Sequence, residues 1–125
     1  MSDSLSLKER VIMLNEKIAE GLEVLLQDIV SKYNAFTNQL STDSGGERVK
    51  AFEEGLSISV GRKYAKIMSN GSVWGFVVNT ESDKKFSLGD ILYPAGWATP
   101  SRNKARGNVI TQEWGVSWTG PNYLK

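Results

Sequence analysis

Apolar side chains in the first third of the chain recur at helical spacing. Between residues 5 and 40 the chain contains neither proline nor a glycine pair. Nine steps of three or four residues cover 33 residues, a mean of 3.67, so the apolar stripe stays on one side of a nearly straight helix. The pattern predicts one long helix over residues 5–40, with Ser6 and Glu9 as a capping box at its start. The stripe consists of Leu7, Val11, Leu14, Ile18, Leu22, Leu25, Ile29, Tyr33, Phe36 and Leu40.

The apolar arc of this helix is wider than a two-helix seam requires. Further apolar positions such as Ile12 and Leu26 widen it to about 160°, with glutamates opposite. The helix either lies on the sheet of its own domain or also packs against a partner chain. The second alternative arises because a helix of about ten turns is longer than a small sheet. The second interpretation gives residues 5–40 a role in assembly. The isolated Gly21 is a candidate for a close helix crossing.

The remainder of the chain has the pattern of an antiparallel sheet. The segment STDSGG (41–46) ends the helix and predicts a turn or short linker. Residues 56–60 alternate strictly, and the β-rich segments 63–68 and 73–79 are joined through Asn70-Gly71, the strongest short hairpin signal. Residues 86–93 and 113–118 read as further strands, whereas 47–54 fit a short helix or a first strand. We therefore expect one α+β domain over residues 1–125, with a long N-terminal helix followed by a compact twisted antiparallel β-sheet over 47–125.

Two absences limit the chemistry. The chain has no Cys and no His, which excludes disulfides, Cys-ligated zinc and the usual catalytic triads, and leaves carboxylate or lysine chemistry. A net charge of +1 and 40% hydrophobic residues are typical of a soluble globular protein. No apolar run is long enough to cross a bilayer, and MSDSLSLKER lacks the order of a signal peptide. We expect a cytoplasmic protein.

A basic loop is the main candidate for a binding site. Residues 97–108, WATPSRNKARGN, carry Arg102, Lys104 and Arg106 with no acid between Asp90 and Glu113. Cations concentrated in a loop between strands indicate an anion site, and the alternative is a solvated basic loop.

A second basic cluster could complete a convergent pocket. Strand alternation places Arg62 and Lys66 on one face and Lys63 on the other. The acidic residues Glu53, Asp83 and Asp90 fit surface or turn positions better than an acid and base pair. No phosphate-binding glycine loop or calcium loop occurs, because the glycines lack the required spacing, and we expect no cofactor and no metal.

Several motifs together resemble one family. GRKYAKI (61–67), SVWGFV (72–77), FSLGDIL (86–92), the 97–108 loop and WTGPNYL (118–124) are similar to small phage and prophage proteins of the first Thoeris anti-defence family. The resemblance implies a non-enzymatic sponge, in the cytoplasm of an infected bacterium, for the cyclic ADP-ribose isomer made by TIR-domain immune enzymes. It also implies homodimers, or hexamers of dimers, with the nucleotide at the dimer interface. Some members bind cyclic trinucleotides at separate sites.

The resemblance also implies site residues. Arg102 and Arg106 match the paired arginines that hold the ligand, and Phe76 or Trp74 supplies the aromatic face for adenine. Lys104 of the same loop and Arg62 of the second basic cluster are further candidates for ligand binding, from their charge and not from the resemblance. Because both arginines lie in a Gly- and Pro-bounded loop, we expect them to be solvated and replaceable by alanine with little change in stability.

Two other functions fit the same residues. An aromatic sheet with a basic loop also describes single-strand nucleic-acid-binding modules, although the pI of about 7.9 is low for a groove that follows a polyanion. A structural oligomeric phage protein, assembled through the helix and with a solvated basic loop, is the third hypothesis.

Overall fold

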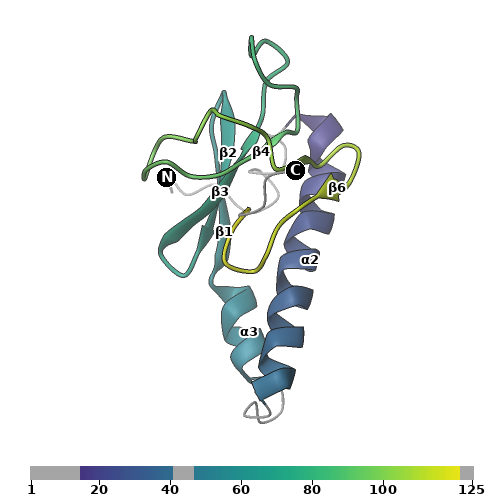
Figure 1. The fold of residues 1–125 in the computed structure, drawn as a ribbon, viewed down its shortest axis with the longest axis vertical. Helices are drawn as coiled ribbons and strands as arrows, with labels where there is room; N and C mark the ends of the chain where they lie inside the picture. The colour runs from purple at the N-terminus through teal and green to yellow at the C-terminus, as the bar shows by residue number, and fades with distance from the viewer. Residues whose placement is uncertain (1–14, 41–46, 122–125) are drawn as a thin grey trace, which may run out of the picture.

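A long helix packed on a four-stranded antiparallel sheet forms the body of the protein (Figure 1). The structure is a computed structural model, and it describes residues 15–40 and 47–121. Its elements are α2 (Glu16–Leu40), α3 (Glu47–Glu54), β1 (Leu56–Val60), β2 (Tyr64–Ser69), β3 (Ser72–Val78), β4 (Ile91–Leu92), β5 (Gly107–Asn108) and β6 (Glu113–Trp114). The predicted α+β class is confirmed, and residues 47–54 form a helix. Neither of the described helices is long and apolar enough to cross a membrane.

The helix α2 begins at Glu16, with Asn15 at its N-terminus, and residues 5–14 of the predicted helix lie outside the described residues. The Asn15 side-chain oxygen accepts a hydrogen bond from the Lys17 amide at 3.0 Å, as an N-cap residue does. The Asn15 amide donates to Asn79 Oδ1 at 2.9 Å instead of to a preceding helical carbonyl. The predicted capping box at Ser6 and Glu9 and the linker at 41–46 lie outside the described residues.

The sheet has the order β1-β2-β3-β4, with neighbouring strands antiparallel. The predicted hairpin between β2 and β3 turns at Asn70 and Gly71, whose φ angles of 53° and 84° are both left-handed. Two positive φ values in succession are what a two-residue hairpin turn of the primed type requires, and Asn-Gly adopts them at low cost. The hairpin signal therefore identified both the turn and its position.

A bulge in β3 separates the two aromatic residues that the sequence offered as alternatives. Ile67 pairs with Gly75 and Met68 with Val73, so Trp74 is an extra residue on β3. Trp74 consequently joins the core cluster beneath α2, while Phe76 joins a second cluster on the opposite face of the sheet. Regular alternation would have placed both rings on one face.

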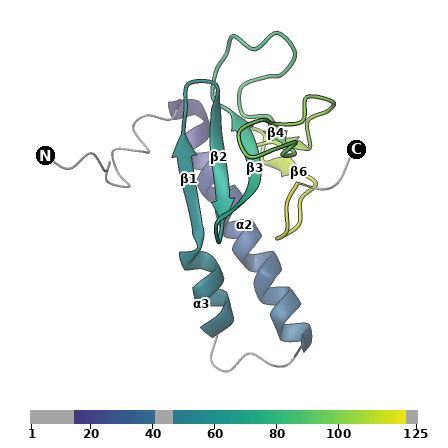
Figure 2. The ribbon, with the colours of Figure 1, turned by 90° about the vertical axis from the view of Figure 1, so that its left-hand side faces the viewer.

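The main core lies between α2 and the inner face of the sheet, which Figure 2 shows with the helix behind the strands. Ile18, Leu22, Leu25 and Ile29 are buried there, so this part of the apolar stripe is used within the chain. Gly21 lies on the same side of the helix, and its close neighbour is the backbone of Val109. The predicted close approach is real, but it joins the helix to a loop and not to another helix.

The half of α2 that extends beyond the sheet packs against α3 and the C-terminal loop. Tyr33 stacks on Phe52 of α3, with ring centroids 4.2 Å apart. Trp118 stands edge-on to Tyr33 at 5.0 Å and lies 5.0 Å from Phe36. These aromatic contacts explain how a helix longer than the sheet still finds apolar partners in its own chain.

The last two predicted strands are much shorter than the sequence suggested. In 86–93 only Ile91 and Leu92 pair with β3, because Gly89 (φ 90°) and Asp90 form a turn in which Asp90 accepts from the Ser87 amide. In 113–118 only the first two residues pair, with β5. Residues 79–90 and 93–106 are therefore mainly loops.

Candidate functional site

Parts of these two loops pack on the outer face of the sheet, the face that α2 leaves free, at its β3–β4 side, and the loops leave β1 and most of β2 uncovered (Figure 2). Phe76, Val78 and Leu92 of the sheet form a small apolar cluster there with Phe86. Tyr64 and Ala105 pack against its margin. The loops are thus anchored by apolar contacts, and their charged residues are carried at the surface above the cluster.

Arg102 is held in a defined orientation above this cluster. Its guanidinium donates to both carboxylate oxygens of Asp83, at 2.9 and 3.0 Å, and to the Tyr64 hydroxyl at 2.6 Å. It also lies 5.0 Å from the Phe86 ring centroid. The side chain is nevertheless 42% exposed. A guanidinium has five N–H donors, so a group that is oriented by three hydrogen bonds still has donors for a ligand.

Asp83 is the residue that positions Arg102. Its side chain is 8% exposed, and it accepts hydrogen bonds from the backbone amides of Lys85 and Phe86 at 2.8 Å. The hydrogen bonds from Arg102, followed by those from the two amides, hold the pKa of Asp83 far below its usual value of 3.8. Asp83 is therefore ionised at neutral pH, and its carboxylate oxygens are hydrogen-bonded to Arg102 and to two backbone amides.

A hollow of about 390 Å³ opens beside this ion pair. Its cations, Lys63, Lys84 and Arg102, come from three segments that are distant in the sequence. Asp83 is its one acidic lining residue, and Arg102 neutralises it. The remaining lining residues are Tyr64, Thr80 and Ser82. A surplus of cations with hydroxyl groups among them suits a phosphate or another anion.

The net charge of +1 conceals a strong separation of charge. The helices α2 and α3 carry seven acidic and four basic residues. Residues 61–66 and 79–106 carry eight basic and three acidic residues. The basic residues are therefore concentrated in the β-strand and loop segments, and these attract anions more strongly than the total charge suggests.

Arg106 is a structural residue in the described chain, contrary to the expectation of a solvated side chain. It is 6% exposed, and its guanidinium donates to the carbonyl oxygens of Pro121 and Lys104 at 3.1 and 3.2 Å. A third bond, at 3.3 Å, reaches Asn103 Oδ1. Arg106 thus ties the basic loop to the C-terminal segment, and the two arginines have different environments.

Of the other predicted site residues, two are exposed and two are buried. Lys104 and Arg62 are exposed, whereas Trp74 and Phe76 are each only 2% exposed. Phe76 lies near the Arg102 site, because its ring is 5.8 Å from that of Tyr64, but protein atoms cover it. Trp74 lies on the other side of the sheet, where its indole donates to Ser117 O at 3.2 Å.

Sequence reasoning missed the contribution of residues 80–85. Asp83 was interpreted as a turn residue, which it is, but its role in holding Arg102 depends on a contact across 19 positions. The available signal was the run Asp83-Lys84-Lys85 directly before Phe86, a pair of cations next to an apolar anchor.

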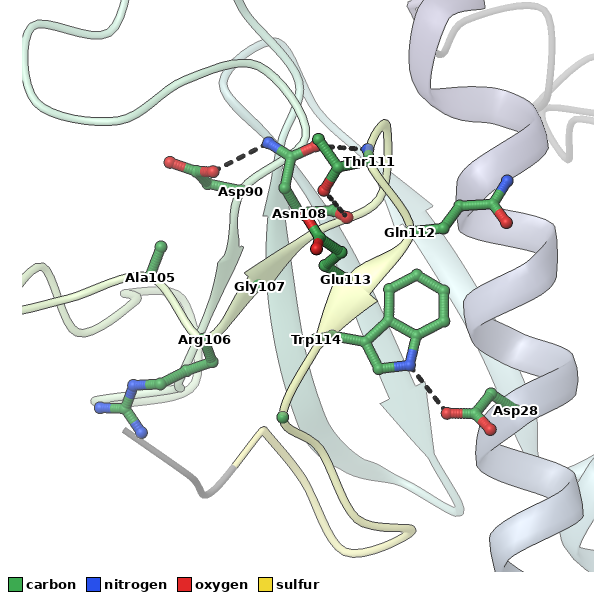
Figure 3. Close-up of a pocket in the computed structure, with 11 residues that line it drawn as sticks. Asp28, Asp90, Ala105, Arg106, Gly107, Asn108, Thr111, Gln112, Glu113 and Trp114 are labelled. Carbon is green, nitrogen blue, oxygen red and sulfur yellow. Dashed lines mark hydrogen bonds between the residues drawn. The ribbon is translucent and has the colours of Figure 1, made fainter. Parts of the chain in front are cut away.

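A larger hollow of about 780 Å³ lies between α2 and the β5–β6 hairpin, and it is less suited to anions. Figure 3 shows Trp114 donating to Asp28, and Asn108 bonded to Asp90. Asp28, Asp90 and Glu113 line this hollow, whereas the guanidinium of Arg106 points away from it (Figure 3). In residues 15–40 and 47–121 no group of acidic side chains is arranged to hold a metal ion.

Comparison with known proteins adds no relative. No family model, curated protein or solved structure matches the chain.

Proposed function

We propose that the protein binds a small anionic nucleotide and sequesters it without chemical turnover. The observation that carries this proposal is the hollow that is lined by Lys63, Lys84 and the oriented Arg102. The ligand class is a cyclic ADP-ribose isomer made by TIR-domain immune enzymes, as the resemblance to the first Thoeris anti-defence family implies. On this proposal the protein is a phage-encoded sponge that acts in the host cytoplasm.

The absence of turnover has support in the chemistry of the site. The sequence contains no His or Cys that could act as base or nucleophile. The carboxylate at the hollow, Asp83, is paired with Arg102 and bonded by two amides, which leaves it a poor proton acceptor. A site of this kind holds an anion and leaves its bonds intact.

Tight sequestration favours more than one chain. A few phosphate contacts and one stacked base give roughly micromolar affinity, whereas an effective sponge needs roughly nanomolar affinity. The described hollow is open to solvent on a single chain, so a second copy that encloses the nucleotide would supply the difference. A homodimer, or a hexamer built from dimers, is therefore part of the proposal.

The test is capture and release of the natural product. The protein is incubated with the product mixture of a TIR enzyme, separated by filtration and denatured by heat, and the released molecule is identified by mass spectrometry. Release of the unchanged nucleotide is expected. Release of a converted product would show that the protein is an enzyme and not a sponge. Capture of no nucleotide would refute the proposal.

Matched variants locate the binding site. Arg102→Ala and the double variant Lys63→Ala, Lys84→Ala should each weaken binding by about tenfold or more, because each removes charge from the hollow. Arg102→Lys keeps the charge but loses the planar fork and should recover only part of the affinity. Lys50→Ala on α3 is the control, since it removes a cation outside the site. Equal loss in the control would show that total charge, and not this hollow, determines binding.

A further inference from the structure

Trp97 is the most exposed large apolar side chain in the described part of the protein. It is 62% exposed, compared with 45% for Ile110 and 40% for Tyr93. An indole exposed to this extent leaves a large apolar surface that a ligand can contact.

The loop that carries Trp97 is closed and internally bonded. The amides of Ala95 and Gly96 both donate to the Thr99 carbonyl oxygen, at 2.9 and 3.0 Å. Pro94 and Pro100 form a bridge at the base of the loop. Two prolines and two converging hydrogen bonds restrict the backbone, so the position of Trp97 is well defined.

Lys66 fixes Trp97 from the sheet. Its ammonium donates to the Trp97 carbonyl oxygen at 2.9 Å and lies 4.5 Å from the centroid of the indole ring. The cation covers one face of the ring, and the exposure of the residue leaves the rest of the ring accessible. An aromatic ring fixed in this way can bind a flat partner with little loss of conformational entropy.

The Trp97 loop and the Arg102 site are neighbours on the outer face of the sheet. Lys66, which holds Trp97, and Tyr64, which bonds Arg102, are two residues apart on β2. Residues two apart on a strand lie on the same face, about 7 Å from each other. Trp97 lies outside the lining of the hollow, so a ligand that touches both must extend along this face from Arg102 toward Lys66.

We infer that Trp97 stacks on the base of the nucleotide whose phosphates bind beside Arg102, an inference that rests on the proposed function. Trp74 and Phe76 are buried, so neither presents a ring face at this site. Tyr64 lines the hollow, but it is half-buried and its hydroxyl is bonded to Arg102. Trp97 offers a more exposed ring on the same face of the sheet, and Lys66 orients it as Asp83 orients Arg102. The site thereby binds anions that carry a base more tightly than simple phosphates.

The experiment compares a probe with a base and a probe without one. Binding of a TIR-made cyclic ADP-ribose isomer and of inorganic pyrophosphate is measured by calorimetry. Trp97→Ala should weaken nucleotide binding about 5- to 150-fold and leave pyrophosphate binding unchanged. Trp97→Phe, which keeps a ring, should retain most of the nucleotide affinity. Arg102→Ala should weaken both probes, and Ile110→Ala should weaken neither.

The outcomes separate this inference from the proposed function. If the parent protein binds the nucleotide and Trp97→Ala binds it equally well, the stacking role is wrong and the proposed sequestration of the nucleotide is unaffected. If the parent binds no nucleotide, both are wrong. If Trp97→Ala loses both probes and sediments as a smaller species, Trp97 belongs to a contact between chains, which also overturns the stacking role.

Discussion

Gly21 of α2 lies directly against the backbone of Val109. A Cβ atom at residue 21 would stand 2.6 Å from the Val109 carbonyl carbon and closer still to its oxygen. This contact joins the long helix to the segment between β5 and β6, so the hairpin beside the larger hollow depends on a residue almost ninety positions earlier in the chain.

Gly21→Ala should therefore destabilise the protein, although alanine is the better helix former. The clash involves backbone atoms that cannot move aside without shifting the hairpin, and we expect a loss of about 2 kcal/mol or more in the free energy of unfolding. This exceeds the ~1 kcal/mol that alanine gains in helix propensity. Gly96→Ala is the control, because a Cβ there meets nothing within 4 Å. Urea unfolding compares the three proteins, and a Gly21→Ala variant as stable as the parent would contradict the close packing.

Arg106→Ala should lower stability, whereas Lys104→Ala should not. Removing the buried guanidinium leaves the carbonyl oxygens of Pro121 and Lys104 without their donor, at a cost of roughly 1–3 kcal/mol. The exposed Lys104 should change stability by no more than about 0.5 kcal/mol. Thermal unfolding of both variants tests this. Ligand binding should be compared only under conditions where Arg106→Ala remains folded, since a loss of affinity in an unfolded fraction says nothing about contacts.

Asp83 should make the protein sensitive to acid. Its pKa in the folded state lies below the usual 3.8, so its ionised form stabilises the fold at higher pH. That stability should be lost as the pH falls below about 3.8, where the carboxylate is protonated first in the unfolded chain and then in the folded one. Unfolding of the parent and of Asp83→Asn is measured between pH 7 and pH 2. The stability difference between them should shrink at low pH, and a constant difference would argue against this role of Asp83.

Salt should affect binding only slightly if the ligand is a small nucleotide. Two or three contacts to one enclosed anion displace few counterions, so the dissociation constant should change little between about 50 and 200 mM salt. A groove that follows a single-stranded nucleic acid would lose orders of magnitude over the same range. The measurement uses the nucleotide and a mixed-sequence oligonucleotide in parallel. Tight oligonucleotide binding with a steep salt slope would favour the nucleic-acid-binding hypothesis.

Local patterns determined much of the architecture. The 3.67-residue spacing predicted α2, and Asn70-Gly71 predicted the hairpin, because both depend on interactions between residues close in the sequence. The start of α2 at Asn15 was not predicted, since the backbone amide of Asn15 bonds to Asn79, sixty-four positions away. The short strands after residue 86 were overestimated, because apolar residues such as Phe86 serve to anchor loops as well as to form strands.

The basic character of the site was evident in the sequence, whereas the individual roles of its residues depended on the tertiary structure. Arg102 and Arg106 look equivalent in the segment 97–108, yet one is exposed beside Asp83 and the other is buried beneath the C-terminal segment. Trp74 and Phe76 look equivalent too, and a single bulge sends them to opposite faces. Charge and hydrophobic periodicity can be read from the sequence because they depend only on residues that are close together in the chain. Burial and pairing follow from contacts between distant segments, and these decide which cation and which ring a ligand can reach.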